Sequence, residues 1–218
     1  LLTPPPAPAA KPDVLAAVRR MGVLQIDTIQ VVARSPYLVL FSRLGEYDPA
    51  WLDEHLAEGC LFEHWSHAAC FAPVEDYPLL RRFMLDGGPG WMGARPWIEA
   101  HRELVESILA RIRAEGGLRS ADFEAKKPAG GWWAWKDEKI ALEVLFITGE
   151  LMVARREKFQ RVYDLPERVL PGWDQFPVPP AEEVRRELVL RSVEKLGAAR
   201  PGWVADYYRL PKNGTPAL

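Results

Sequence analysis

The sequence predicts a mainly helical α+β fold in which one arrangement, helices followed by a two-stranded hairpin, occurs twice. Apolar residues recur at helical spacing over residues 97–114 and 137–148. Short apolar runs separated by tight polar turns follow the helical stretches at 60–72 and 151–165, and they predict hairpins. Helix, short helix, longer helix and hairpin is the order of a winged-helix domain, so tandem winged helices are expected.

The first copy is preceded by residues 1–12, a Pro- and Ala-rich segment that we expect to be an extended linker. Asp13 is a candidate cap for the first helix, and Gly22 suits its end. The expected elements are then a helix at 13–21, a strand or extended segment at 23–29, helices at 36–44 and 48–59, and a hairpin at 60–72. With a further helix at 75–85, the first winged-helix domain covers residues 13–96.

The second copy is expected at residues 97–180. Its elements are a helix at 96–114, a cap signal at Ser120, a helix at 137–148 ended by Gly149, and the hairpin at 151–165. Residues 181–218 resemble the opening helices of a third copy that stops before its second long helix and its wing. We therefore expect a truncated third domain, with residues missing upstream of the first as well.

Composition restricts the class of protein. The 218 residues are 48% hydrophobic and 27% charged, which predicts a packed core, and the net charge of -2 argues against binding polyanions over the whole surface. A local basic patch remains compatible with that charge. Only two cysteines, Cys60 and Cys70, are present, so a reducing, cytoplasmic setting is expected, without a disulfide scaffold. No apolar run is long enough to span a membrane.

Gln25 and Asp27 stand two residues apart within an apolar stretch. In an extended segment, residues i and i+2 project from the same face, so a carboxamide and a carboxylate would point at one place. Such a pair can hold and polarise a water molecule. On spacing alone, a cap or a satisfied polar residue at a strand end is the favoured interpretation of Asp27.

The second hairpin carries the clearest electrostatic signal. Its residues 153–162 have a net charge of +3, because they include four cationic residues and one acidic residue, Glu157. Lys136 and Lys139 lie at the start of the preceding helix. Phosphate contacts use cations at hairpin tips and helix starts. Nucleic-acid contact and an ordinary solvated hairpin both remain open on this pattern.

Two further clusters have alternative interpretations. Cys60, His64, His67 and Cys70 are zinc-ligand types, but they crowd one tight hairpin, so buried thiols and polar turn histidines are the favoured interpretation. His64 or His67 could instead position a phosphate or a water near Gln25 and Asp27. A tryptophan cluster at 132–135 favours core packing over a wedge into DNA. The sequence has no Gly-rich phosphate loop and no G-x-S-x-G motif.

Several ordered blocks of the chain resemble the YcaQ/AlkZ-like winged-helix DNA glycosylases. They are LQIDTIQVVARS from Leu24, SRLGEY from Ser42, EHWSHA from Glu63, and the run from Thr148 to Leu165. The resemblance covers nearly the whole chain. Because Gln25-Ile26-Asp27 stands where the family carries Gln-x-Gln or Gln-x-Asp, the chain is similar to the Gln-x-Asp, YcaQ-type branch.

The resemblance implies a monofunctional DNA-repair glycosylase that hydrolyses the N-glycosidic bond of N7-alkylated purines, including bulky and interstrand-crosslink adducts. Asp27 and Gln25 would be catalytic, and the partner would be double-stranded DNA carrying the lesion. The expected DNA-binding residues are Arg155, Arg156, Lys158, Arg161, Lys136, Lys139, Arg43 and His67. No metal, cofactor, nucleotide or membrane is expected, and the protein is expected to be monomeric and nucleoid-associated in a bacterial cytoplasm. The alternatives are a winged-helix DNA binder or regulator without catalysis, and a protein-interaction module.

Overall fold

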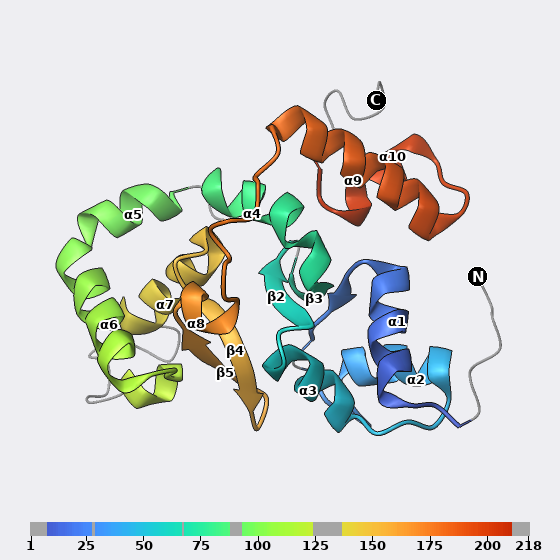
Figure 1. Cartoon of the computed structure of the whole chain (residues 1–218), viewed down its shortest axis with the longest axis horizontal. Coiled ribbons are helices and arrows are strands. Elements are labelled where there is room, and N and C mark those ends of the chain that lie inside the picture. The colour runs from blue at the N-terminus through green and yellow to red at the C-terminus, as the bar shows by residue number, and fades with distance from the viewer. Residues whose placement is uncertain (1–7, 28, 67, 88–92, 124–136, 211–218) are drawn as a thin grey trace. The chain divides into compact units, whose positions relative to one another are not determined.

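The computed structural model describes residues 8–27, 29–66, 68–87, 93–123 and 137–210 (Figure 1). The chain divides into two compact units. The first comprises Leu1–Arg82 and Pro177–Leu218, and the second comprises Phe83–Phe176. The described residues are mainly helical, with two small antiparallel sheets. Among them, no helix has both the length and the apolar character needed to cross a membrane.

The first unit begins with helices and strands in an alternating order. Its elements are α1 (Lys11–Met21), β1 (Leu24–Gln25), α2 (Ser35–Leu44), α3 (Ala50–Ala57), β2 (Leu61–Trp65) and β3 (Ala69–Pro73). The strands form one sheet in the order β1-β3-β2, and both pairings are antiparallel. Every residue of the central strand β3 is buried, so this strand lies in the core of the unit.

Two local predictions for this unit need adjustment. Helix α1 begins at Lys11, and Asp13 lies inside its first turn, where the carboxylate accepts the backbone N–H of Ala10 at 2.8 Å. Asp13 therefore stabilises the start of the helix from its third position. Pro12 also fits the first turn, because no backbone N–H is needed there. Among the described residues of the strand expected at 23–29, those that form a strand are Leu24–Gln25.

The C-terminal helices belong to the first unit. After β3 come the 3-10 turn η1 (Val74–Asp76) and α4 (Tyr77–Leu85), and later α9 (Ala181–Leu196) and α10 (Pro201–Tyr207). Arg191 of α9 forms an ion pair with Asp76, which is 8% exposed. The Tyr207 hydroxyl donates to the carbonyl of Met21 at 2.5 Å. These contacts fasten the helices after residue 177 to the N-terminal part of the chain.

The second unit combines helices with a hairpin. Its elements are α5 (Ala94–Ala100), α6 (Arg102–Glu115), the 3-10 turn η2 (Ser120–Phe123), α7 (Asp137–Thr148), β4 (Met152–Glu157), β5 (Gln160–Asp164) and α8 (Pro166–Val169). Leu118 and Tyr163 exchange both backbone hydrogen bonds, at 2.9 and 2.8 Å, which adds a third short segment beside β5. Helix α7 is almost wholly buried from Ala141 onward and forms the centre of the unit.

In the second unit, the structure confirms the bounds of one predicted helix and divides another predicted helix into two. Helix α7 has the predicted bounds, and Gly149 follows it with φ +81°. The single helix expected at 96–114 is two helices, α5 and α6, with a break at His101. The His101 ring stacks on Trp97 with centroids 4.1 Å apart, and its Nδ1 lies 2.9 Å from the Trp97 carbonyl. This local bonding accompanies the departure of His101 from helical geometry.

Candidate functional site

Gln25 and Asp27 lie on the accessible side of the segment that starts at β1. Burial alternates along it: Leu24 and Ile26 are 2% and 6% exposed, whereas Gln25 is exposed and Asp27 is partly exposed. The Ile26 N–H donates to the carbonyl of Ala69 at 2.7 Å, so the segment follows β3 for one residue beyond the strand. The alternation agrees with the expectation that Gln25 and Asp27 share a face.

The carboxylate of Asp27 is held by the backbone. Its Oδ1 accepts the N–H of Ile29 at 2.9 Å, a side-chain bond to the residue two positions on that is typical of a turn. The bond lies just beyond the paired residues Leu24–Gln25 of β1. It also fixes the orientation of the carboxylate while the side chain stays partly exposed to solvent.

Gln25 belongs to a row of three polar residues across the sheet. It pairs with Cys70 of β3, which pairs in turn with His64 of β2, and directly opposed residues project from the same face. Cys70 is fully buried, and burial raises the pKa of its thiol to about 12. Burial also lowers the pKa of His64 to about 4. Both groups are therefore neutral at pH 7, and only Gln25 at the end of the row is exposed.

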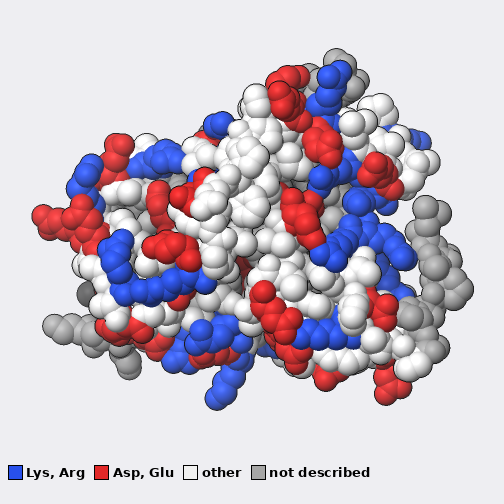
Figure 2. All heavy atoms as spheres, in the orientation of Figure 1, with Lys and Arg blue, Asp and Glu red and all other residues white. Residues whose placement is uncertain are grey.

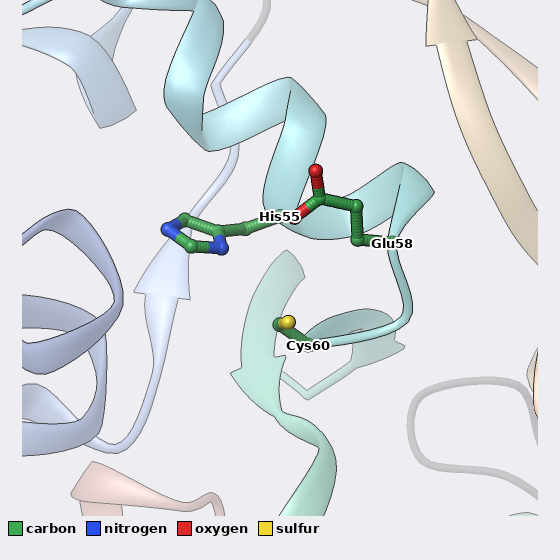
Figure 3. A group of neighbouring side chains, drawn as sticks. All are labelled: His55, Glu58 and Cys60. Carbon is green, nitrogen blue, oxygen red and sulfur yellow. The ribbon is translucent and has the colours of Figure 1, made fainter. Parts of the chain in front are cut away.

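The cysteines and histidines considered as a zinc set are distributed differently from the sequence pattern. His64 and Cys70 face each other across β2 and β3. Cys60 instead lies near His55 and Glu58, two residues that the sequence patterns did not indicate (Figure 3). The signal that could have found them is their spacing, because positions i and i+3 of a helix lie on one face. His67, Lys136 and the tryptophans at 132–135 lie outside the described residues.

The tip of the β4–β5 hairpin presents cations with partners of their own. Arg155 pairs with Glu157 at 2.7 Å, and both side chains are well exposed. Arg156 lies over the ring of Phe159, 4.4 Å from its centroid, and donates to the Phe159 carbonyl. Lys158 is exposed at the turn, where it and Phe159 both have positive φ. Figure 2 shows basic side chains projecting where Figure 1 places this tip, with acidic ones beside them.

Arg161 has a different environment from the other hairpin cations. Its side chain is 13% exposed and pairs with Glu143 of α7, with Nη1 2.9 and 3.0 Å from the two carboxylate oxygens. The guanidinium also lies 4.6 Å from the centroid of the Phe146 ring. The Tyr163 hydroxyl donates to the same carboxylate at 3.0 Å, and burial raises the pKa of Tyr163. Arg161 therefore joins the hairpin to α7, and a phosphate would have to compete with Glu143 for it.

The remaining predicted DNA-binding residues are exposed on two helices. Arg43, near the end of α2, donates to the carbonyl of Val39 at 3.0 Å and to the Ser42 hydroxyl. Lys139 lies in the first turn of α7. Gln25, Asp27 and Arg43 thus belong to the first unit, whereas the hairpin cations and Lys139 belong to the second.

Comparison with known proteins identifies the family. The sequence model of the family described as "DNA glycosylase AlkZ-like" matches residues 18–218, which is nearly the whole chain. The chain therefore belongs to the AlkZ-like DNA glycosylase family, as the sequence blocks around Gln25 and Thr148 predicted. No solved structure matches the chain significantly. Family membership implies a DNA-repair glycosylase, a hydrolase of N-glycosyl bonds, with DNA as its partner.

Proposed function

We propose that this chain provides the catalytic and DNA-binding parts of a monofunctional glycosylase that removes N7-alkylated purines, including bulky and interstrand-crosslink adducts, from double-stranded DNA. The observation that carries the proposal is the family match over residues 18–218. Gln25 and Asp27, on the accessible side of their strand segment, are the proposed reaction centre. The Gln-x-Asp spacing would place the protein in the YcaQ-type branch of the family.

The proposed architecture is a tandem of winged helices, at residues 13–96 and 97–180. In the first unit, β1 follows α1 and pairs with β3, the second strand of the hairpin. In the second unit, Leu118 follows α6 and bridges Tyr163 in the second strand of its hairpin. In both units, a short segment that follows a helix therefore pairs with the second strand of the hairpin, which supports the proposed repeat. Helices α9 and α10 would open the third copy, at 181–218.

The chemistry needs few groups, because an N7-alkylated guanine is already cationic. When the bond from C1′ to N9 breaks, its electron pair goes to the base, which leaves neutral without a general acid. Positive charge develops on the sugar, and the Asp27 carboxylate would stabilise it. Water then adds to C1′, and its proton passes to Asp27 acting as general base.

The geometry around Asp27 suits this role. The Ile29 N–H bond uses Oδ1, so Oδ2 is the oxygen proposed to take the proton. Because the turn already fixes the carboxylate, little reorganisation is needed before reaction. Gln25, on the same side of the segment, would orient the water or the carboxylate. An open site of this kind suits a lesion joined to both strands, which cannot be fully flipped into a deep pocket.

DNA binding is proposed to depend on the hairpin tip and on exposed helical cations. Lys158, Arg155 and Arg156 would contact phosphates from the tip, with Arg43 and Lys139 as further contacts. His67, which lies in the family-like block from Glu63, and Lys136, which belongs to the charge pattern, are proposed contacts as well. Such contacts carry no sequence information, so recognition would rest on the lesion and on DNA shape. Affinity is expected to fall steeply as salt rises.

A second candidate function is DNA binding without catalysis. Asp27 makes a turn bond that would by itself explain an aspartate at this position. In that case the family fold would be kept while the reaction was lost, and Asp27 would only shape the loop.

Release of free base from duplex DNA that contains N7-methylguanine or a nitrogen-mustard crosslink separates the two candidates. The proposed enzyme releases base and leaves intact strands that break only on alkali treatment. Asp27→Asn is the decisive variant, because an amide oxygen can still accept the Ile29 N–H while the negative charge is gone. The matched control is Asp48→Asn, since Asp48 Oδ1 accepts the N–H of Ala50 at the same 2.9 Å and spacing.

The glycosylase proposal requires base release by the unaltered protein and by Asp48→Asn, and the proposed role of Asp27 requires a strong loss in Asp27→Asn. DNA binding without base release in all three proteins would support the regulator instead. Equal release by Asp27→Asn and the unaltered protein would leave the glycosylase but remove Asp27 from its mechanism.

A further inference from the structure

A second cluster of reactive side chains lies at the junction of α3 and β2, apart from Gln25 and Asp27 in sequence. It consists of His55, Glu58 and Cys60 (Figure 3). One imidazole nitrogen, one carboxylate oxygen and one sulfur lie within 4.8 Å of one another. His55 and Glu58 are three residues apart at the end of the helix, so they share a face, and Cys60 follows the turn at Gly59.

The histidine has one ring nitrogen with a partner and one without. His55 is 5% exposed, and its Nε2 lies 2.9 Å from the carbonyl of Lys11. A carbonyl accepts only, so Nε2 carries the proton and Nδ1 is left with a lone pair. Among the described residues, Nδ1 is buried and has no hydrogen-bond partner. In Figure 3 this nitrogen is on the side of the ring that faces Cys60.

Leaving a buried hydrogen-bond acceptor without a partner destabilises the folded protein, so the unpartnered Nδ1 needs an explanation. A histidine whose other nitrogen donates to a backbone carbonyl is the usual arrangement of a metal ligand, because that bond fixes the tautomer and the ring. Lys11 supplies this carbonyl from α1. The buried nitrogen and the nearby thiol are two independent observations that point to the same ligand.

We propose that His55 Nδ1, Cys60 Sγ and a Glu58 carboxylate oxygen bind one zinc ion. Imidazole, thiolate and carboxylate together are ligands that zinc accepts, and three protein ligands leave a fourth position for water or another donor. Donor atoms around tetrahedral zinc are about 3.5 Å apart, so the three side chains would draw together by about 1 Å. Cys60 and Glu58 can move in this way because both side chains are at least partly exposed.

Zinc binding would replace one of the two ion pairs that Lys11 forms. The Lys11 Nζ contacts Glu58 and Glu54, each at 2.6 Å. When zinc takes Glu58, the ammonium group keeps Glu54 as its partner. The Cys60 thiol releases its proton as the thiolate binds the metal. The ion would tie the end of α3 to the start of β2 and so stabilise the first unit.

Titration with Co²⁺ as a spectroscopic probe tests the site directly, since a cobalt–thiolate bond gives a near-ultraviolet charge-transfer band. Zinc affinity is then measured by competition with a chromophoric chelator. We expect one ion per chain, a band that zinc abolishes, and loss of the band in Cys60→Ser. The matched control is Cys70→Ala, which removes the other cysteine and should keep the band.

Glu58→Gln tests the third ligand at an exposed position. It should weaken zinc binding by at least about 10-fold, because losing even a group that only supports a ligand typically costs about 10- to 100-fold in metal affinity. Circular dichroism establishes that each variant is folded. No charge-transfer band in the unaltered protein overturns the proposal. A band that survives in folded Cys60→Ser, or that is lost in folded Cys70→Ala, overturns it equally. DNA-glycosylase activity plays no part in this test, so its outcome is independent of the proposed function.

Discussion

Replacing Glu143 with Gln tests whether Arg161 is mainly a structural residue. The change removes the charge that faces a guanidinium whose side chain is 13% exposed. Breaking a fully buried ion pair costs about 3–5 kcal/mol. Here both side chains keep some contact with water, and the glutamine oxygen can still accept one hydrogen bond. We therefore expect a loss of about 2 kcal/mol in the free energy of unfolding.

The control is a glutamate of the β4–β5 hairpin. Glu157 pairs with Arg155 at 2.7 Å and with Arg119 at 3.4 Å, but these side chains are 38–49% exposed. Exposed pairs of this kind contribute about 0–1 kcal/mol, so Glu157→Gln should change stability little. Urea unfolding measures both variants, and hydrogen exchange in α7 and β5 localises the effect. Equal losses in the two variants would show that burial does not distinguish the two ion pairs.

The other predictions concern DNA binding, pH and backbone geometry. Lys158→Gln should lower the slope of log K for DNA binding against log salt by about 1. The free energy of unfolding should change by less than about 0.5 kcal/mol. An unchanged slope would show that Lys158 does not contact DNA phosphates. His64 has a folded-state pKa of about 4 and an unfolded value of 6.5, so stability should rise with pH between these values, by at most about 1.4 kcal/mol per pH unit. Urea unfolding at pH 4.5 and 7 should show this rise, and His64→Leu should flatten it; an equally steep variant would contradict the assignment. Gly149→Ala should cost about 1–2 kcal/mol in thermal unfolding, because φ is +81° and the new Cβ would lie 3.1 Å from the Met84 sulfur; Gly202→Ala, with open space around it, should not be destabilising.

The sequence predicts best where local signals decide the structure. The bounds of α7 follow from its apolar periodicity and from Gly149, and the second hairpin follows from its two apolar runs. The chemistry-bearing pair, Gln25 and Asp27, was placed on one face by spacing alone. Burial along the segment agrees with that placement.

Tertiary partners are what the sequence could not supply. A charge count treats Arg161 and Arg155 alike, yet only Arg161 meets a half-buried glutamate 18 residues earlier in the chain. The periodicity of 96–114 is continuous, and nothing in it shows that His101 would stack on Trp97 and interrupt the helix. His55 reads as an ordinary helical residue until the carbonyl of Lys11, 44 positions away, is found at its Nε2.

The catalytic role of Asp27 is tested most directly by the single-turnover rate of base release from duplex DNA containing N7-methylguanine, with protein in excess. Asp27→Asn should lower this rate by about 10²–10⁴-fold, the range that a positioned general base contributes. The dissociation constant for the same DNA should stay within about threefold, and Asp48→Asn should match the unaltered protein in both quantities. A rate in Asp27→Asn equal to that of the unaltered protein, at equal DNA binding, would show that Asp27 takes no part in base release.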